Sequence, residues 1–206
     1  MGNKFVYLSF IISMFCISNV IAQGDPDAGA QKTQTCSVCH GPNGNSINPM
    51  WPKLAGQHPL YTLKQLQNFK SGSRSNPQMT PMVVALSDQD MMDIAAYYAS
   101  QSPVESQLPS SMENRDVELG EKIYRAGDTT KSIASCMACH GPTATGNPAA
   151  NYPNLAGQHA SYTAAQLQAF KNESRENDTN SVMRDVALKL TNEEIEAVSQ
   201  YLQGLY

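Results

Sequence analysis

The sequence CSVCH at residues 36–40 recurs as CMACH at residues 136–140. Two cysteines separated by two residues lie about one helical turn apart, so both thiols reach one flat ligand while the next histidine meets its centre. This spacing is the attachment signature of c-type haem, which takes the thiols as thioethers and the imidazole on its iron. A single copy is also compatible with a redox dithiol or half a zinc site, but two copies in matching contexts favour haem. The candidate cofactor-binding residues are Cys36, Cys39, Cys136 and Cys139, and the candidate iron ligands are His40 and His140.

Length and composition restrict the class of protein. With 206 residues, of which 41% are apolar and 16% charged, the chain is long enough for one large or two small globular domains. The formal net charge of -4 argues against nucleic acid or an anionic membrane surface as a partner. It leaves docking to a basic patch on another protein open.

Residues 1–22 have the features of a signal peptide. Lys4 supplies a positive charge, residues 5–21 form an apolar run, and Ala22 provides the small residue that a signal peptidase requires. An uncleaved anchor is the alternative, but a run of 17 residues is at the lower limit for a membrane span, which favours cleavage before Gln23. We therefore expect export to the periplasm. The four cysteines beyond residue 22 all belong to the two CxxCH motifs, so none is left for a disulfide.

The second half of the chain repeats the first. WPKLAGQH at residues 51–58 corresponds to YPNLAGQH at 152–159, and YTLKQLQNFK at 61–70 corresponds to YTAAQLQAFK at 162–171. This continuous match indicates a tandem duplication of one haem-binding module. The expected segments are a signal peptide over 1–22, a first domain over 23–100, a linker rich in Ser, Pro and Glu over 101–114, and a second domain over 115–206.

Helical spacing of apolar residues and capping signals predict an all-α fold with three helices in each module. In the first module one helix begins at Asp25-Pro26 and a second runs from near Pro59 to Gly72. The third opens with a capping box at residues 87–90, which recurs at residues 191–194. No alternation long enough for a strand is present. Three short helices bury little by themselves, so we expect the porphyrin to complete each core.

A second axial ligand for each iron must come from a histidine or a methionine, unless that position is left open for chemistry. Met79 and Met183 each lie eight residues before the cap residue of the last helix in their module, and no other methionine is matched between the copies. They are the candidate second ligands. His58 and His159 also match and would give bis-histidine haems. Their position at the start of the middle helix favours a cap-region or propionate-contacting role instead.

Together these motifs resemble the dihaem cytochrome c4 family over essentially the whole chain beyond residue 22. The resemblance rests on two CxxCH modules, each followed by PxLAGQH and YTxxQLQxFK, and on the MTPM, VMRDVA and QYLQGLY segments. It implies two class I cytochrome c domains related by a pseudo-twofold axis, with two covalently attached haem c groups close to the domain interface. It also implies that the carbonyls of Pro52 and Pro153 accept hydrogen bonds from the axial histidines, and that Met79 and Met183 are the axial methionines.

The expected function is electron transfer without catalysis, because an iron held by histidine and methionine has no vacant position. The resemblance also implies a periplasmic carrier of a kind that is often loosely associated with the membrane, although this sequence does not determine membrane attachment. We expect a monomer that shuttles electrons from a quinol-oxidising bc-type complex to a terminal oxidase. One alternative is the dihaem electron-accepting subunit of an enzyme complex such as a flavocytochrome sulfide dehydrogenase. A dihaem peroxidase is a weaker alternative, because it needs an iron with an accessible face.

Overall fold

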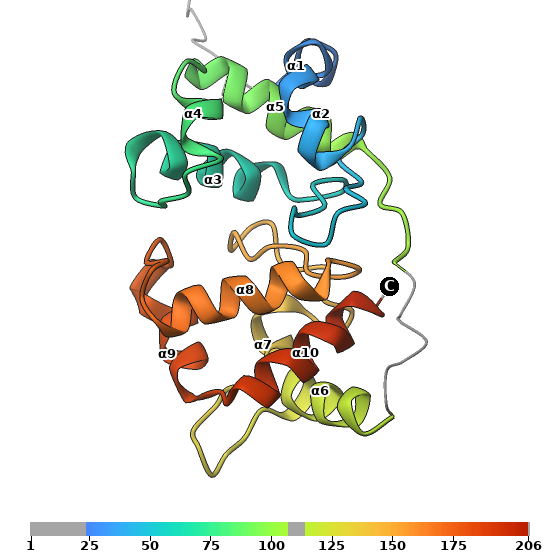
Figure 1. Ribbon diagram of the computed structural model, residues 1–206, viewed down its shortest axis with the longest axis vertical. Coiled ribbons are helices and arrows are strands. Elements are labelled where there is room, and N and C mark those ends of the chain that lie inside the picture. Colours follow the sequence, from blue (N-terminus) through green and yellow to red (C-terminus); the bar gives the residue numbers. More distant parts are fainter. Residues whose placement is uncertain (1–23, 107–113, 206) are drawn as a thin grey trace, which may run out of the picture.

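The structure is a computed structural model that describes residues 24–106 and 114–205, the side chains of residues 114–116 excepted. The expected signal peptide and most of the expected linker lie outside these residues. Figure 1 shows two helical bodies stacked one on the other, the first half of the chain above and the second half below. In the part of the chain that the structure describes, no helix is both long and apolar enough to cross a bilayer.

The first domain contains five helices. They are α1 (Pro26–Lys32), α2 (Gln34–His40), α3 (Pro59–Ser71), α4 (Thr80–Val83) and α5 (Asp88–Ser100). The carboxylate of Asp25 accepts hydrogen bonds from two backbone N–H groups of the first turn of α1, and Pro26 follows at the first helical position. Helix α3 ends at Gly72, whose φ of 82° is left-handed and therefore suited to glycine.

The second domain repeats this order. It contains α6 (Asn114–Ala126), α7 (Met137–His140), α8 (Ala160–Lys171), the short 3-10 helix η1 (Thr179–Ser181), α9 (Val182–Lys189) and α10 (Asn192–Gln203). The described residues form no strand beyond two isolated bridges, which confirms the all-α prediction. The described residues of each domain form more helices than the three that the sequence predicts. The short helices at the CxxCH motifs and at the candidate methionines have too few residues to produce a periodic pattern.

Capping boxes begin the last helix of both domains, as predicted. The hydroxyl of Ser87 accepts from the backbone N–H of Asp90, and the carboxylate of Asp90 accepts from the backbone N–H of Ser87. Thr191 and Glu194 make the same reciprocal pair in α10. Each box satisfies N–H groups that a helix start leaves without an intrahelical partner.

A glycine in the first helix lets the first and last helices of each domain cross closely. A Cβ atom added at Gly29 of α1 would lie 2.1 Å from the carbonyl oxygen of Asp93 in α5. In the second domain a Cβ at Gly120 would lie 2.2 Å from the carbonyl oxygen of Ala197 in α10. Only glycine allows this backbone approach, which brings the CxxCH helix that follows onto the core of its own domain.

Each domain has its own apolar core. In the first domain the fully buried Met91, Ile94 and Tyr98 of α5 pack with Leu66 and Phe69 of α3. The second domain's core joins residues of α6, α8 and α10. The two clusters are separate, so each domain folds around its own core and the domains meet through polar side chains.

Candidate haem sites

His40 is the last residue of α2 and is 6% exposed. Its Nδ1 lies 2.9 Å from the carbonyl oxygen of Pro52. A carbonyl only accepts, so Nδ1 carries the proton and Nε2 keeps its lone pair for a metal. Burial lowers the pKa of His40, against the effect of the Pro52 carbonyl, which keeps the imidazole neutral as a metal ligand must be.

His140 has the same environment at the end of α7. It is also 6% exposed, and its Nδ1 lies 3.1 Å from the carbonyl oxygen of Pro153. Burial lowers its pKa too. The hydrogen bonds to Pro52 and Pro153 implied by the family resemblance are therefore both present. Such a contact fixes the ring orientation and raises the basicity of the ligating nitrogen.

The four cysteines of the two motifs are unpaired and half-buried. Cys36 packs against the core of the first domain and Cys136 against that of the second. Burial raises the pKa of the Cys36 thiol and raises that of Cys136 to about 11. A redox dithiol needs the opposite, a thiol whose pKa is lowered. These thiols are suited to covalent attachment of an apolar ring beside the core.

The candidate methionines occupy equivalent places after the middle helix. Met79 precedes α4 and packs against the core cluster that Cys36 also contacts. Met183 lies half-buried in the first turn of α9. Among the other methionines of the first domain, Met50 is 63% exposed and Met91 is 1% exposed within the core.

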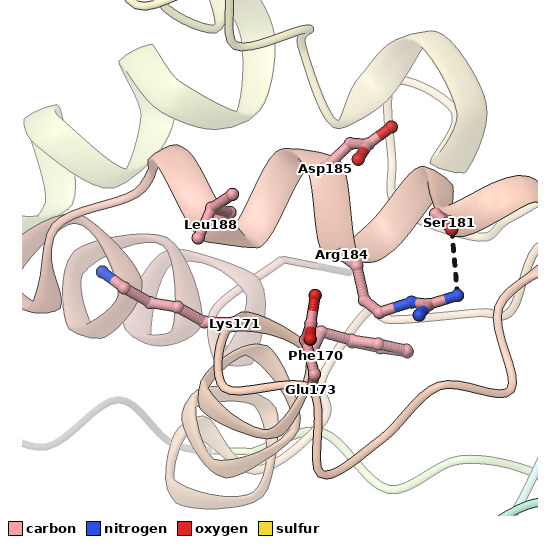
Figure 2. Close-up of a pocket in the computed structure, with 7 residues that line it drawn as sticks. All are labelled: Phe170, Lys171, Glu173, Ser181, Arg184, Asp185 and Leu188. Carbon is pink, nitrogen blue, oxygen red and sulfur yellow. Dashed lines mark hydrogen bonds between the residues drawn. The ribbon is translucent and has the colours of Figure 1, made fainter.

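Both candidate methionines are held through their backbone N–H by a side-chain oxygen. Met79 donates to Oδ1 of Asn76 over 3.0 Å, and Met183 donates to Oδ2 of Asp178 over 3.0 Å. Asp178 Oδ1 also accepts from Nε of Arg184 over 2.9 Å. Figure 2 shows Arg184 extending from α9 and donating to the hydroxyl of Ser181, beside a cavity of about 100 Å³. That cavity lies between α9 and the end of α8, and no candidate haem residue lines it.

The donor set of each domain fits haem c. Among the described residues no three His, Cys, Asp or Glu side chains converge as they would around a protein-bound zinc ion. Each domain instead offers one buried imidazole whose Nε2 keeps its lone pair, two thiols in a CxxC spacing, and a thioether at the start of the helix that follows the middle helix. These are the groups that covalent attachment and axial ligation of haem require.

His58 and His159 lie at the predicted cap position, and the structure adds contacts that the sequence did not predict. Both occupy the N-cap position of the middle helix, but neither side chain makes a capping hydrogen bond. His58 Nε2 lies 2.7 Å from the carbonyl oxygen of Thr145, and His159 Nε2 lies 2.8 Å from that of Ser46. Each histidine therefore contacts the loop that follows the CxxCH motif of the other domain. Sequence position placed them correctly on the helix, but only the docking of the domains provides these partners.

Reasoning from the sequence missed the polar residues that join the domains. Arg74 and Arg175 are buried at the interface, and Gln57 and Gln158 each bond to the backbone of the other domain. Every one of these contacts is reciprocal, which agrees with the pseudo-twofold relation between the domains. The repeat contains a sign of their importance, because all four residues match between the copies. It does not indicate, however, whether a matched polar residue faces its own domain or the other.

Comparison with known proteins agrees with this geometry. The family model described as Cytochrome c matches residues 27–102 and 117–206. Cytochrome c4 of Thiocapsa roseopersicina is 48% identical over 184 residues, which cover 88% of this chain and 93% of that protein. The crystal structure of reduced recombinant cytochrome c4 from Pseudomonas stutzeri superimposes with a TM-score of 0.85 at 44% identity, covering 89% of this chain and 100% of that one.

The name of a further relative includes the enzyme from which it accepts electrons. The thiosulfate dehydrogenase electron acceptor of Stutzerimonas stutzeri (strain A1501) is 36% identical over 188 residues, 90% of this chain and 84% of that protein. Like the cytochromes c4, it aligns across both haem-binding modules. The chain belongs to the dihaem cytochrome c4 family, and it is an electron-transfer protein that carries two covalently bound haem c groups.

Proposed function

We propose that the two haems are attached and ligated by equivalent residues of the two domains. In the first domain the thioethers form with Cys36 and Cys39, and His40 and Met79 are the axial ligands. In the second domain the corresponding residues are Cys136, Cys139, His140 and Met183. The observation that carries this assignment is the orientation of the two buried imidazoles, each with Nδ1 bound to a proline carbonyl and Nε2 left to ligate.

The protein residues determine what such a site does. When bound, haem iron accepts and releases one electron at a time. A histidine and a methionine leave no position for oxygen or peroxide, so we propose that neither site is catalytic. The soft thioether sulfur favours the reduced ion, which raises the reduction potential relative to two histidines. The Nδ1 contacts of His40 and His140 fix the orientation of the two imidazoles, which would keep the rearrangement on electron transfer small.

We further propose that the protein is a monomeric periplasmic shuttle from a quinol-oxidising bc-type complex to a terminal oxidase. Residues 1–22 would direct export, and domains over 23–100 and 115–206 would each carry one haem, joined by the linker over 101–114. The leader-like composition of residues 1–22 supports export. The similarity to cytochromes c4 supports the role of carrier. Loose association with the membrane would shorten the path to both membrane complexes.

Mass spectrometry and spectroscopy of the exported protein test this proposal. We expect the added mass of two haems, and the red-region absorption band of oxidised haem that marks methionine sulfur ligation. The Met79→His and Met183→His variants should each remove about half of that band. Reduced protein should also be oxidised rapidly by membranes that contain a terminal oxidase. A wild-type protein without the sulfur band would overturn the assignment of the methionines, and an inert reduced protein would overturn the oxidase as acceptor.

The second candidate function is that of an electron-accepting subunit. It is favoured by the relative named as a thiosulfate dehydrogenase electron acceptor, whose similarity extends over 90% of this chain. A sulfide-oxidising flavocytochrome is another enzyme complex that could contain such an electron-accepting subunit. Purification of the native protein under mild conditions would distinguish the functions. A stoichiometric dehydrogenase partner that reduces this chain faster than the bc-type complex does would favour the subunit.

A further inference from the structure

One peptide group in each domain contacts both the axial histidine and the other domain. The carbonyl oxygen of Pro52 accepts from His40 Nδ1 at 2.9 Å. The N–H of the same peptide group, which belongs to Lys53, donates to Oε1 of Gln158 at 2.9 Å. Gln158 lies 105 residues away in the second domain. A single peptide plane therefore connects a glutamine of one domain to the iron ligand of the other.

The second domain has the reciprocal arrangement. The carbonyl oxygen of Pro153 accepts from His140 Nδ1 at 3.1 Å, and the backbone N–H of Asn154 donates to Oε1 of Gln57 at 2.9 Å. Gln57 belongs to the first domain and matches Gln158 in the repeated AGQH sequence. The contact therefore occurs twice, once in each domain, between residues that match in the repeat.

Each glutamine is held firmly in this position. Nε2 of Gln158 donates to the carbonyl oxygen of Lys53 at 2.9 Å, and Nε2 of Gln57 donates to that of Asn154 at 2.9 Å. Each Oε1 also accepts from the backbone N–H of the histidine that follows it. Backbone N–H groups can only donate, so the orientation of both amides is determined by their partners. The side chains are buried, with 9% of Gln57 and 8% of Gln158 exposed.

The peptide group transmits this contact electronically. Its C–N bond has partial double-bond character, so an acceptor at the N–H shifts electron density toward the carbonyl oxygen. Hydrogen bonds in series therefore strengthen one another. A more negative proline carbonyl binds the Nδ1 proton of the histidine more strongly and makes Nε2 a better donor to the metal. A better nitrogen donor stabilises the oxidised ion.

We propose that Gln57 and Gln158 are positioning residues that each tune the axial histidine of the haem in the opposite domain. Gln158 acts on His40 through the Pro52–Lys53 peptide, and Gln57 acts on His140 through the Pro153–Asn154 peptide. The inference rests on the proposed ligation by these two histidines. It means that docking of the domains lowers both reduction potentials, and that each potential depends on a residue of the other domain.

Domain-resolved measurement of the two reduction potentials in the full-length holoprotein tests this inference. In Gln158→Met the potential of the first haem should rise, and its axial Nδ1 proton should shift in the NMR spectrum, while the second haem stays unchanged. Gln57→Met should give the mirror result. Gln168→Met provides the control. Within the described residues, the side chain of Gln168 donates to Asn192 of its own domain and makes no hydrogen bond to the other domain, so both potentials should stay unchanged.

A shift confined to the haem in the opposite domain distinguishes tuning of the axial histidine from a general role of the glutamine in the interface. If Gln158→Met shifts the second haem, shifts both haems equally or shifts neither, the inference is wrong. If the methionine variants fail to fold, deuterium exchange of the wild-type holoprotein decides. The Lys53 and Asn154 amides should be protected, and exchange as fast as that of an exposed loop would overturn the contact. Failure of the proposed function can be told apart from failure of this inference. It would appear as missing haem or missing histidine ligation in the wild-type protein.

Discussion

Arg74 of the first domain donates from Nη2 to the phenolic oxygen of Tyr162 in the second domain over 3.1 Å. Arg175 makes the reciprocal bond to Tyr61 over 3.0 Å. Both guanidinium groups are buried, and each also stacks on the phenylalanine five residues earlier in the chain. No carboxylate in the described part of the chain pairs with either arginine. The neutral oxygens of tyrosine and glutamine therefore solvate two buried charges.

The Arg74–Tyr162 contact should contribute measurably to stability. A hydrogen bond to a charged group contributes about 1.5–3 kcal/mol, so we expect Tyr162→Phe to lower the free energy of unfolding by about 2 kcal/mol. In the background of Arg74→Met the same substitution should cost much less, because the charge that needs the oxygen is gone. A double-mutant cycle in denaturant measures this coupling. Additive effects of the two substitutions would contradict it.

The two methionines proposed as axial ligands should differ in how firmly they are held. Asp178, whose side chain is 5% exposed, binds Met183 N–H and the guanidinium of Arg184, whereas the neutral Asn76 holds Met79. Charge-assisted hydrogen bonds are about twice as strong as neutral ones. We expect Asp178→Asn to weaken Met183 ligation by about 1–2 kcal/mol and leave Met79 unaffected. Loss of the sulfur absorption band in denaturant, resolved by domain, is the measurement.

Asp185 provides the matched control for this substitution. It lies on α9, as Met183 does, and carries the same charge as Asp178, but it is exposed. Asp185→Asn should leave the band unchanged in both domains. Equal effects of the two substitutions would mean that charge near α9, and not the contact to Met183, is responsible.

The helix crossing at Gly29 should not tolerate a methyl group. A Cβ there would lie 2.1 Å from the Asp93 carbonyl, so the helices must move apart. Overpacking of this kind costs about 1–3 kcal/mol, and we expect Gly29→Ala to be near the upper end. Gly72→Ala is the control. No atom lies within 4 Å of its added Cβ, and only the left-handed φ opposes it, at about 1 kcal/mol. Thermal unfolding compares the two, and equal losses would contradict the crossing argument.

Acid should destabilise the first domain through Asp93. This carboxylate is 4% exposed in its side chain and accepts from the backbone N–H of Asp25 and from Nζ of Lys32. The Asp25 hydrogen bond first, and then Lys32 and Gln89, lower the pKa of Asp93 from its ordinary value of 3.8. The stabilisation is therefore complete above that value and is lost as the pH falls through the lower pKa of the folded state.

Asp93→Asn should reveal this dependence. At neutral pH the variant should be less stable than the wild type, and the difference should disappear in strong acid, where wild-type Asp93 is protonated. Unfolding in denaturant at several pH values measures it. At neutral pH, substitution of the exposed Glu118 by glutamine should change the stability little. A stability difference that is independent of pH would show that Asp93 acts through packing and not through its charge.

The features that the sequence alone determined are those that depend on local chemistry. The CxxCH spacing, the capping boxes at Ser87 and Thr191, and the middle-helix start at Pro59 depend on residues within one or two turns of one another. The repeat added a long-range comparison, which separated Met79 from the other methionines of its half. These features required no knowledge of how the domains dock.

Only the tertiary structure decided which residues of one domain touch the other. His58 sits at the helix cap that the sequence predicts, yet its ring bonds to Thr145, 87 residues away. Gln57 and Gln158 are matched polar residues whose partners are backbone atoms 97 and 105 residues distant. A backbone N–H or carbonyl has the same chemistry at every position, so no side-chain pattern marks it as a partner. The link between a glutamine and the proposed axial histidine of the other domain therefore exists only where the folded domains bring both within hydrogen-bond distance of the same peptide group.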